Sequence, residues 1–100
     1  MSKPNIVLNH GTLAVSGQLT RQSVVHIKNS EYVHWFAHGA INVDLIKVSK
    51  ADTAGLAWLF YLLEQAAQHS CQLTFSNLPE KLTKLITLSG VDGLLPITCD

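Results

Sequence analysis

The chain is 100 residues long, and 47% of these residues are hydrophobic. A chain of this length forms one core, so residues 1–100 are expected to form a single domain. Seven basic residues balance seven acidic ones, which disfavours binding to nucleic acid through net charge. Charged residues make up only 14% of the chain, where about 25% is usual. This scarcity predicts that a partner protein covers part of the surface.

The sequence has no pattern typical of secretion or membrane insertion. Only a short apolar stretch follows Lys3, whereas a signal peptide has an apolar core of about 7–15 residues. The longest apolar run, residues 54–63, is about half of a membrane span. We therefore expect a cytoplasmic protein without direct membrane insertion. Cys71 and Cys99 have no CxxC spacing, so reduced thiols are expected, with Cys71 in the core.

Hydrophobic patterning predicts strands that alternate with helices. An N-terminal β-hairpin is expected over residues 6–8 and 13–19, followed by a helix up to Gly39, a central strand over 40–46 covered by helices, a helix over 53–68, a strand over 72–76 and a helix from Pro79 to Gly90. Thr20 can N-cap the first helix, which the pair Asn29-Ser30 can break midway. A further strand is expected around Ile97. This order indicates an α/β fold.

The helix expected over residues 53–68 has two apolar faces when it is projected at about 100° per residue. The face expected to pack on the sheet carries Leu56, Leu59, Phe60, Leu63 and Ala67. The opposite face carries Ala54, Trp58, Tyr61 and Gln65, with Leu62 at its border. Either another helix of the domain covers this second face, or it is a protein interface, where Trp and Tyr are favoured. The low charge of the chain favours the interface.

The start of this helix has two interpretations. Asp52 or Thr53 can act as an ordinary N-cap, and the small residues Ala54 and Gly55 leave the first turn open to close approach. Alternatively, Thr53 presents its hydroxyl where a phosphate or an acidic group of a partner would meet the positive end of the helix dipole. Spacing alone does not decide between the two.

Other candidate sites lack essential parts. His34 and His38 would share a helix face, but the Glu of a zinc-protease motif and a third ligand are missing, so no metal site is expected. Asp44 and Asp52 have no accompanying nucleophile and no glycine-rich phosphate loop. We therefore expect neither enzymatic activity nor a cofactor.

The segment VDLIKVSKADTAGLAWLFYLLEQA, residues 43–66, resembles the central signature of STAS domains, the domains of sulfate transporters and anti-sigma factor antagonists. The hydrophobic strand, the Asp-Thr-x-Gly loop and the long apolar helix occur in the family's order. The hairpin before this segment and the tail LTFSNLPEKLTKLITLSGVDGLLP after it extend the resemblance to nearly the whole chain. The resemblance implies an α/β fold with a mixed four- to five-stranded sheet, an N-terminal hairpin and about three helices.

The length of the chain and its segment DTAGLAWL are most similar to those of one member of the family. This member is the small single-domain STAS subunit of the bacterial phospholipid ABC transporter that maintains outer-membrane lipid asymmetry. The resemblance implies a non-enzymatic subunit that binds the ATPase of this complex, beside a membrane permease, and so lies peripheral to the inner membrane. Asp52, Thr53, Ala54 and Gly55 carry over by position. Together with the second face of the helix, this gives the expected partner-binding residues, which are Asp52, Thr53, Ala54, Trp58, Tyr61, Leu62 and Gln65.

The alternative implied by the resemblance is an anti-sigma factor antagonist. In those proteins a phosphorylated Ser or Thr occupies the position of Thr53, so phosphorylation of Thr53 would act as the switch. Ala54 stands where the antagonists often have Ser, and this difference favours a constitutive interface.

Overall fold

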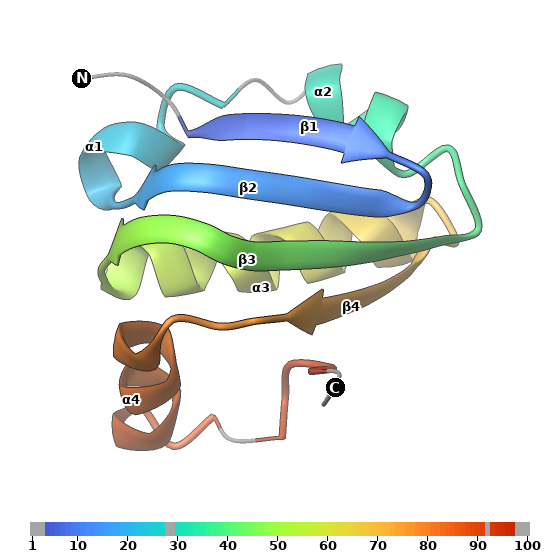
Figure 1. Ribbon diagram of the computed structural model, residues 1–100. Coiled ribbons are helices and arrows are strands. Elements are labelled where there is room, and N and C mark those ends of the chain that lie inside the picture. Colours follow the sequence, from blue (N-terminus) through green and yellow to red (C-terminus); the bar gives the residue numbers. More distant parts are fainter. Residues whose placement is uncertain (1–3, 28–29, 92, 98–100) are drawn as a thin grey trace.

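A single sheet with helices along it forms the domain in the computed structural model, which describes residues 4–27, 30–91 and 93–97 (Figure 1). The strands are β1 (Asn5–Asn9), β2 (Thr12–Leu19), β3 (Ala40–Ala51) and β4 (Gln72–Ser76). The helices are α1 (Arg21–Val24), α2 (Ser30–Trp35), α3 (Thr53–Gln68) and α4 (Glu80–Leu88). The predicted α/β class is confirmed, and α3 and β4 have the predicted bounds.

The sheet is mixed, and its spatial order β1-β2-β3-β4 follows the chain. β1 and β2 form the predicted hairpin, in which His10 and Gly11 have φ angles of 51° and 79°, as a two-residue turn between antiparallel strands requires. β2, β3 and β4 are parallel, so their carboxyl ends lie at the same end of the sheet. The strand expected around Ile97 is a single bridge to Phe75.

Several boundaries differ from the sequence predictions. The first helical region is divided into α1 and α2, and α2 begins at Ser30; Asn29 lies outside the described residues. β3 continues past residue 46 to Ala51, because it pairs with β2 as far as Leu19. Pro79 is the N-cap of α4, so the helix begins one residue later than Pro79.

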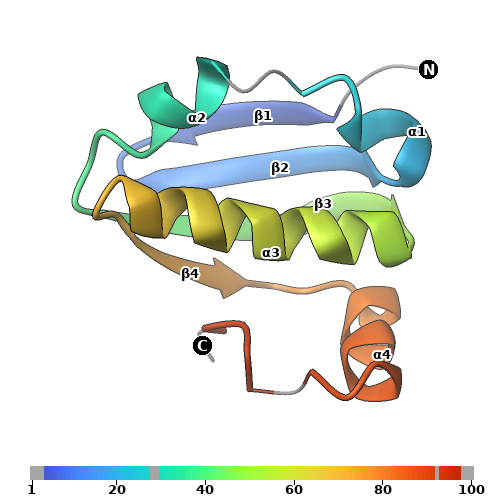
Figure 2. The same ribbon diagram turned by 180° about the vertical axis from the view of Figure 1, so that it is seen from behind.

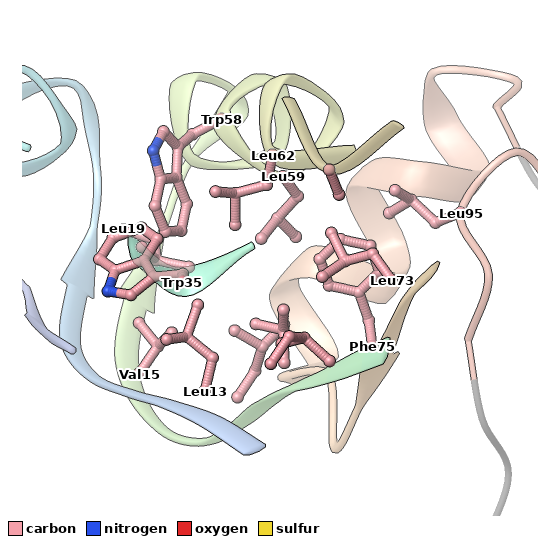
Figure 3. Packing of buried hydrophobic residues seen from close by; sticks show 14 of the residues in the cluster. Leu13, Val15, Leu19, Trp35, Trp58, Leu59, Leu62, Leu73, Phe75 and Leu95 are labelled. Carbon is pink, nitrogen blue, oxygen red and sulfur yellow. The ribbon is translucent and has the colours of Figure 1, made fainter. Parts of the chain in front are cut away.

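The hydrophobic core lies between one face of the sheet and the helices (Figures 2 and 3). The sheet contributes Leu13, Val15, Leu19, Ile41, Val43, Leu45, Leu73 and Phe75, and α3 contributes Leu56, Trp58, Leu59, Leu62 and Ala66. Cys71 is buried, as predicted, and burial raises the pKa of its thiol. Cys99 lies outside the described residues.

The other face of the sheet is not crossed by any described helix (Figure 1). Val7 and Ile46 are 50% and 66% exposed there. The prediction that helices cover β3 therefore holds for one face only. Asn42 occupies the uncovered face and binds the hydroxyls of Thr74 and Ser76, 2.9 and 2.8 Å away, so polar side chains stabilise the uncovered face.

α3 is rotated from its predicted orientation by nearly one residue position. Trp58 and Leu62 are buried, with 6% and 0% of their surface exposed. The prediction of Trp58 on the outer face and of Leu62 at the border of that face is therefore wrong. Phe60 and Leu63 are only partly buried, and Ala67 is exposed. The reason is α2, which packs beside α3 and buries the side of that helix that carries the indole. The alternative that another helix of the domain covers this face is thus correct for its largest residue.

Candidate partner-binding site

The junction of β3 and α3 is organised by one carboxylate. Asp52 is the N-cap of α3, and its Oδ1 accepts a hydrogen bond from the backbone N–H of Gly55 at 3.0 Å. Its Oδ2 accepts from the backbone N–H of Arg21 at 3.1 Å. The side chain therefore satisfies exposed donors at the starts of both α3 and α1, as an N-cap does. Of the two sequence candidates for the cap, Asp52 is the correct one.

Thr53 is the first residue of α3, and it is exposed. Because Asp52 caps the helix, the Thr53 hydroxyl is not needed for that role. No hydrogen bond joins this hydroxyl to the part of the chain that the structure describes. The helix start therefore presents Thr53 to the surface at the positive end of the α3 dipole, and its hydroxyl is available to a partner.

Gly55 sets the distance between α3 and the end of β2. A Cβ atom at this position would overlap the carbonyl oxygen of Leu19. The backbone N–H of Asp52 donates to the same oxygen at 3.2 Å. The close approach expected at this turn is thus made by the domain's own strand, and it holds α1 and α3 side by side.

A stripe of exposed residues continues from Thr53 along α3. Thr53, Ala57 and Tyr61 are exposed at a spacing of four residues, and Ala54 lies half-buried beside them. We call these four residues the α3 outer stripe. Tyr61 is 38% exposed, and its ring packs edge-on against the ring of Tyr32 at a centroid distance of 5.5 Å. The buried ring of Tyr32 thus holds Tyr61 in position at the far end of the stripe.

Ala57 was not among the residues predicted to bind a partner. The i, i+4, i+8 spacing from Thr53 was the available signal, since such residues share one helix face. Gln65 is half-buried on the same helix. Of the seven predicted partner-binding residues, Asp52, Thr53, Ala54, Tyr61 and Gln65 thus keep at least part of their surface, whereas Trp58 and Leu62 belong to the core.

The other candidate groups lie apart from the stripe. α2 ends at Trp35, so His38 lies beyond it and does not share a helix face with His34. Asp44 accepts hydrogen bonds from the Asn77 side chain and the Ile46 backbone, whereas Asp52 binds the starts of α1 and α3. Among residues 4–27, 30–91 and 93–97, no three His, Cys, Asp or Glu side chains are placed to hold a metal ion. None of the helices there is long and apolar enough to cross a bilayer.

A mixed four-stranded sheet, helices packed on one of its faces and an Asp-Thr-x-Gly turn at the start of a long apolar helix together define a STAS-type domain. A family model described as "Mlab, STAS domain" matches residues 3–96. The chain therefore belongs to the MlaB-type STAS family. Among curated proteins, no sequence matches the chain significantly.

Solved structures of anti-sigma factor antagonists are similar in fold. The unphosphorylated form of SpoIIAA has a TM-score of 0.69 at 15% identity, over 97% of this chain and 89% of that one. The phosphorylated form of SpoIIAA from Bacillus has a TM-score of 0.64 at 14% identity, over 97% and 92% of the two chains. A Thermotoga maritima protein, proposed to be an anti-sigma factor antagonist, has a TM-score of 0.71 at 14% identity, over 97% and 86%. At such identities the likeness establishes the fold alone.

Proposed function

We propose that the chain is a non-enzymatic STAS subunit that binds and supports the ATPase of a phospholipid-transport ABC complex maintaining outer-membrane lipid asymmetry. The observation that carries this proposal is the match to the MlaB-type family model over residues 3–96. In this proposal the chain is cytoplasmic, and the ATPase and its membrane permease hold it at the inner membrane.

The contact surface that we propose is the α3 outer stripe with the adjoining helix start. Two interactions keep this surface rigid: the Asp52 carboxylate binds both helix starts, and Gly55 packs on β2. A preorganised surface loses little conformational entropy on binding. Ala54 and Ala57 are small enough for a partner backbone to approach closely, and Tyr61 supplies an aromatic group of the kind enriched in interfaces.

A second candidate function is that of an anti-sigma factor antagonist switched by phosphorylation of Thr53. Two observations favour it. The similar solved structures include SpoIIAA in its phosphorylated form, and the exposed Thr53 hydroxyl makes no hydrogen bond within the described residues. A phosphate at this position would meet the N-terminus of α3, which attracts anions.

Co-purification separates the two functions. The chain is tagged, expressed at its native level in its own cells and recovered under mild conditions, and its partners are identified by mass spectrometry. Recovery of an ABC ATPase together with a membrane permease would support the transporter function. Recovery of a kinase-like anti-sigma factor in their place would support the switch and contradict the transporter function.

The same co-purification with the Thr53→Glu variant tests whether the start of α3 is part of the contact surface. Gln68→Glu, which adds the same charge at the other end of α3, is the matched control.

A further inference from the structure

Among the residues that the structure describes, most of the positive side chains lie at one end of the domain, although the formal net charge of the chain is zero. Because β2, β3 and β4 are parallel, α1, α3 and α4 all begin at the carboxyl end of the sheet. This end lies at the left of Figure 1 and at the right of Figure 2. We call this the basic end, and the described positive side chains there are Arg21 at the start of α1, Lys50 near the end of β3, and Lys81 and Lys84 in α4.

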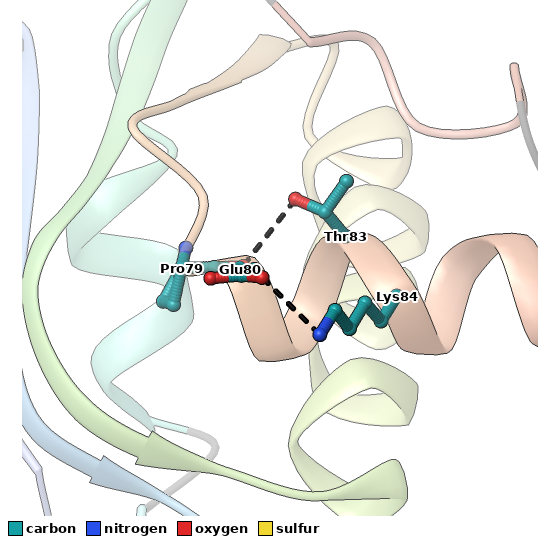
Figure 4. Close-up of polar contacts among 4 residues, drawn as sticks. All are labelled: Pro79, Glu80, Thr83 and Lys84. Carbon is teal, nitrogen blue, oxygen red and sulfur yellow. Dashed lines mark hydrogen bonds and ion pairs between the residues drawn. The ribbon is translucent and has the colours of Figure 1, made fainter.

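The two described carboxylates at the basic end are already engaged. Asp52 accepts from two backbone N–H groups. Glu80 forms an ion pair with Lys84 at 3.2 Å (Figure 4). Arg21, Lys50 and Lys81 form no ion pair with any carboxylate of the described residues.

The remaining described carboxylates lie elsewhere. Glu31 is in α2 at the opposite end of the sheet, Glu64 is in the second half of α3, and Asp44 is within β3. The backbone adds to this asymmetry, because the N-termini of α3 and α4 both carry partial positive charge toward the basic end. Thr53 lies at the same end, beside Asp52 and the start of α1.

We propose that the basic end docks onto an acidic surface of a protein partner, and that it steers this partner onto the α3 outer stripe. This inference rests on the proposed function, because it specifies the chemistry of the partner's contact face. Opposite charges at the edge of an interface mainly raise the association rate. A protein fits better than a nucleic acid or an anionic bilayer, because the unpaired cations are few and adjoin an uncharged stripe that suits an interface core.

Two matched double variants test the proposal. Lys50→Gln/Lys81→Gln removes two positive charges from the basic end, and Gln68→Glu/Gln72→Glu lowers the net charge equally at the opposite end; all four side chains are exposed. The first probe is a blocked oligoglutamate peptide, and its binding is monitored through the amide chemical shifts of the domain. We call Lys50→Gln/Lys81→Gln the lysine variant and Gln68→Glu/Gln72→Glu the glutamine variant. We expect the peptide to shift amide signals at the starts of α1, α3 and α4. These shifts should disappear at high salt and in the lysine variant, and they should persist in the glutamine variant. Shifts spread over the domain, or equal losses in both variants, would overturn the proposal.

The second readout is the association rate of the ATPase recovered by co-purification. We expect this rate to fall steeply with salt in the parent and the glutamine variant, and to be several-fold lower in the lysine variant at low salt. Equal rates in the two variants would overturn the acidic docking face and leave the proposed function standing. Failure to recover an ATPase, with the peptide still bound at the basic end, would reject the proposed function alone. Tighter binding to phosphatidylglycerol vesicles or duplex DNA than to the peptide would also overturn the choice of a protein partner.

Discussion

The indole Nε1–H of Trp58 donates a hydrogen bond to the hydroxyl of Tyr32 at 2.9 Å, and both side chains are buried. This bond joins α2 to α3. The Tyr32 ring also contacts the Trp35 ring edge-on, at a centroid distance of 5.3 Å, and stacks with the Phe36 ring at a centroid distance of 6.4 Å. α2 has only six residues, and so short a helix is not stable without tertiary contacts. The aromatic cluster therefore holds α2 in place, and α2 in turn buries Trp58.

Replacing Tyr32 by Phe tests this connection. The substitution keeps the ring and removes the acceptor, which leaves the buried Trp58 Nε1–H unsatisfied. We expect the free energy of unfolding to fall by about 1–3 kcal/mol, measured by urea denaturation. Val33→Ala, at a 58% exposed position of the same helix, should change it by less than about 0.5 kcal/mol. Parental stability of Tyr32→Phe would show that the bond contributes nothing.

Alkaline pH should destabilise the domain through the same residue. Burial raises the pKa of Tyr32 above its ordinary value, although the hydrogen bond from Trp58 acts in the opposite direction. The neutral phenol is therefore favoured in the folded state, and its stabilising effect is complete below the unfolded pKa of about 10 and lost as the pH rises through the folded pKa. Urea midpoints measured from about pH 8 to about pH 11 should fall more steeply for the parent than for Tyr32→Phe. Parallel curves would contradict this role.

Trp58, predicted on the outer face of α3, is buried, whereas Phe60, predicted in the core, is only partly buried. Truncation of each residue to Ala tests this difference. Trp58→Ala opens a cavity in the core and should cost about 3–5 kcal/mol. Phe60→Ala should cost less, because Phe60 is only partly buried. Denaturation of the two variants side by side gives the order directly. A larger loss for Phe60→Ala would mean that α3 is oriented as the sequence projection suggested.

Gly55→Ala should destabilise the domain, although Ala is the better helix former by about 1 kcal/mol. The added methyl would meet the Leu19 backbone, which cannot rotate away as a side chain can. We expect a net loss of about 1–3 kcal/mol in urea denaturation. Gly39→Ala is the control, because a Cβ there meets nothing within 4 Å. Equal stability of the two variants would mean that α3 does not depend on this contact.

The parts of the fold that local patterns determine were predictable from the sequence. Asp52 before a long apolar run indicates where α3 begins, and the alternation after the Asn9-His10-Gly11 turn indicates β2. The orientation of α3 was not predictable, because both of its faces carry apolar residues and the projection cannot tell which face α2 covers. The buried position of Trp58 depends on Tyr32, 26 residues away in the chain. Spacing along one helix carries no information about such a contact.

The candidate site was predictable to a similar degree. Thr53 and Asp52 are recognisable from the helix start, but the choice between them as N-cap depends on side-chain geometry. The segregation of charge at the basic end was hidden by the balanced net charge. It follows only from the parallel order of β2, β3 and β4, which places Arg21, Lys50 and Lys81 at one end.

The partner-binding role of the α3 start is tested most directly by the affinity of the purified ATPase for the parent chain, Thr53→Glu and Gln68→Glu. Glu at the first position of α3 suits the helix dipole, so the free Thr53→Glu domain should be at least as stable as the parent, as its melting curve will show. In the complex, the added carboxylate would be buried against an acidic partner face beside Asp52, which is costly. We predict that Thr53→Glu binds at least about tenfold more weakly, equivalent to about 1.4 kcal/mol, and that Gln68→Glu binds like the parent. Parental affinity of a folded Thr53→Glu variant would contradict the assignment of this surface to the partner.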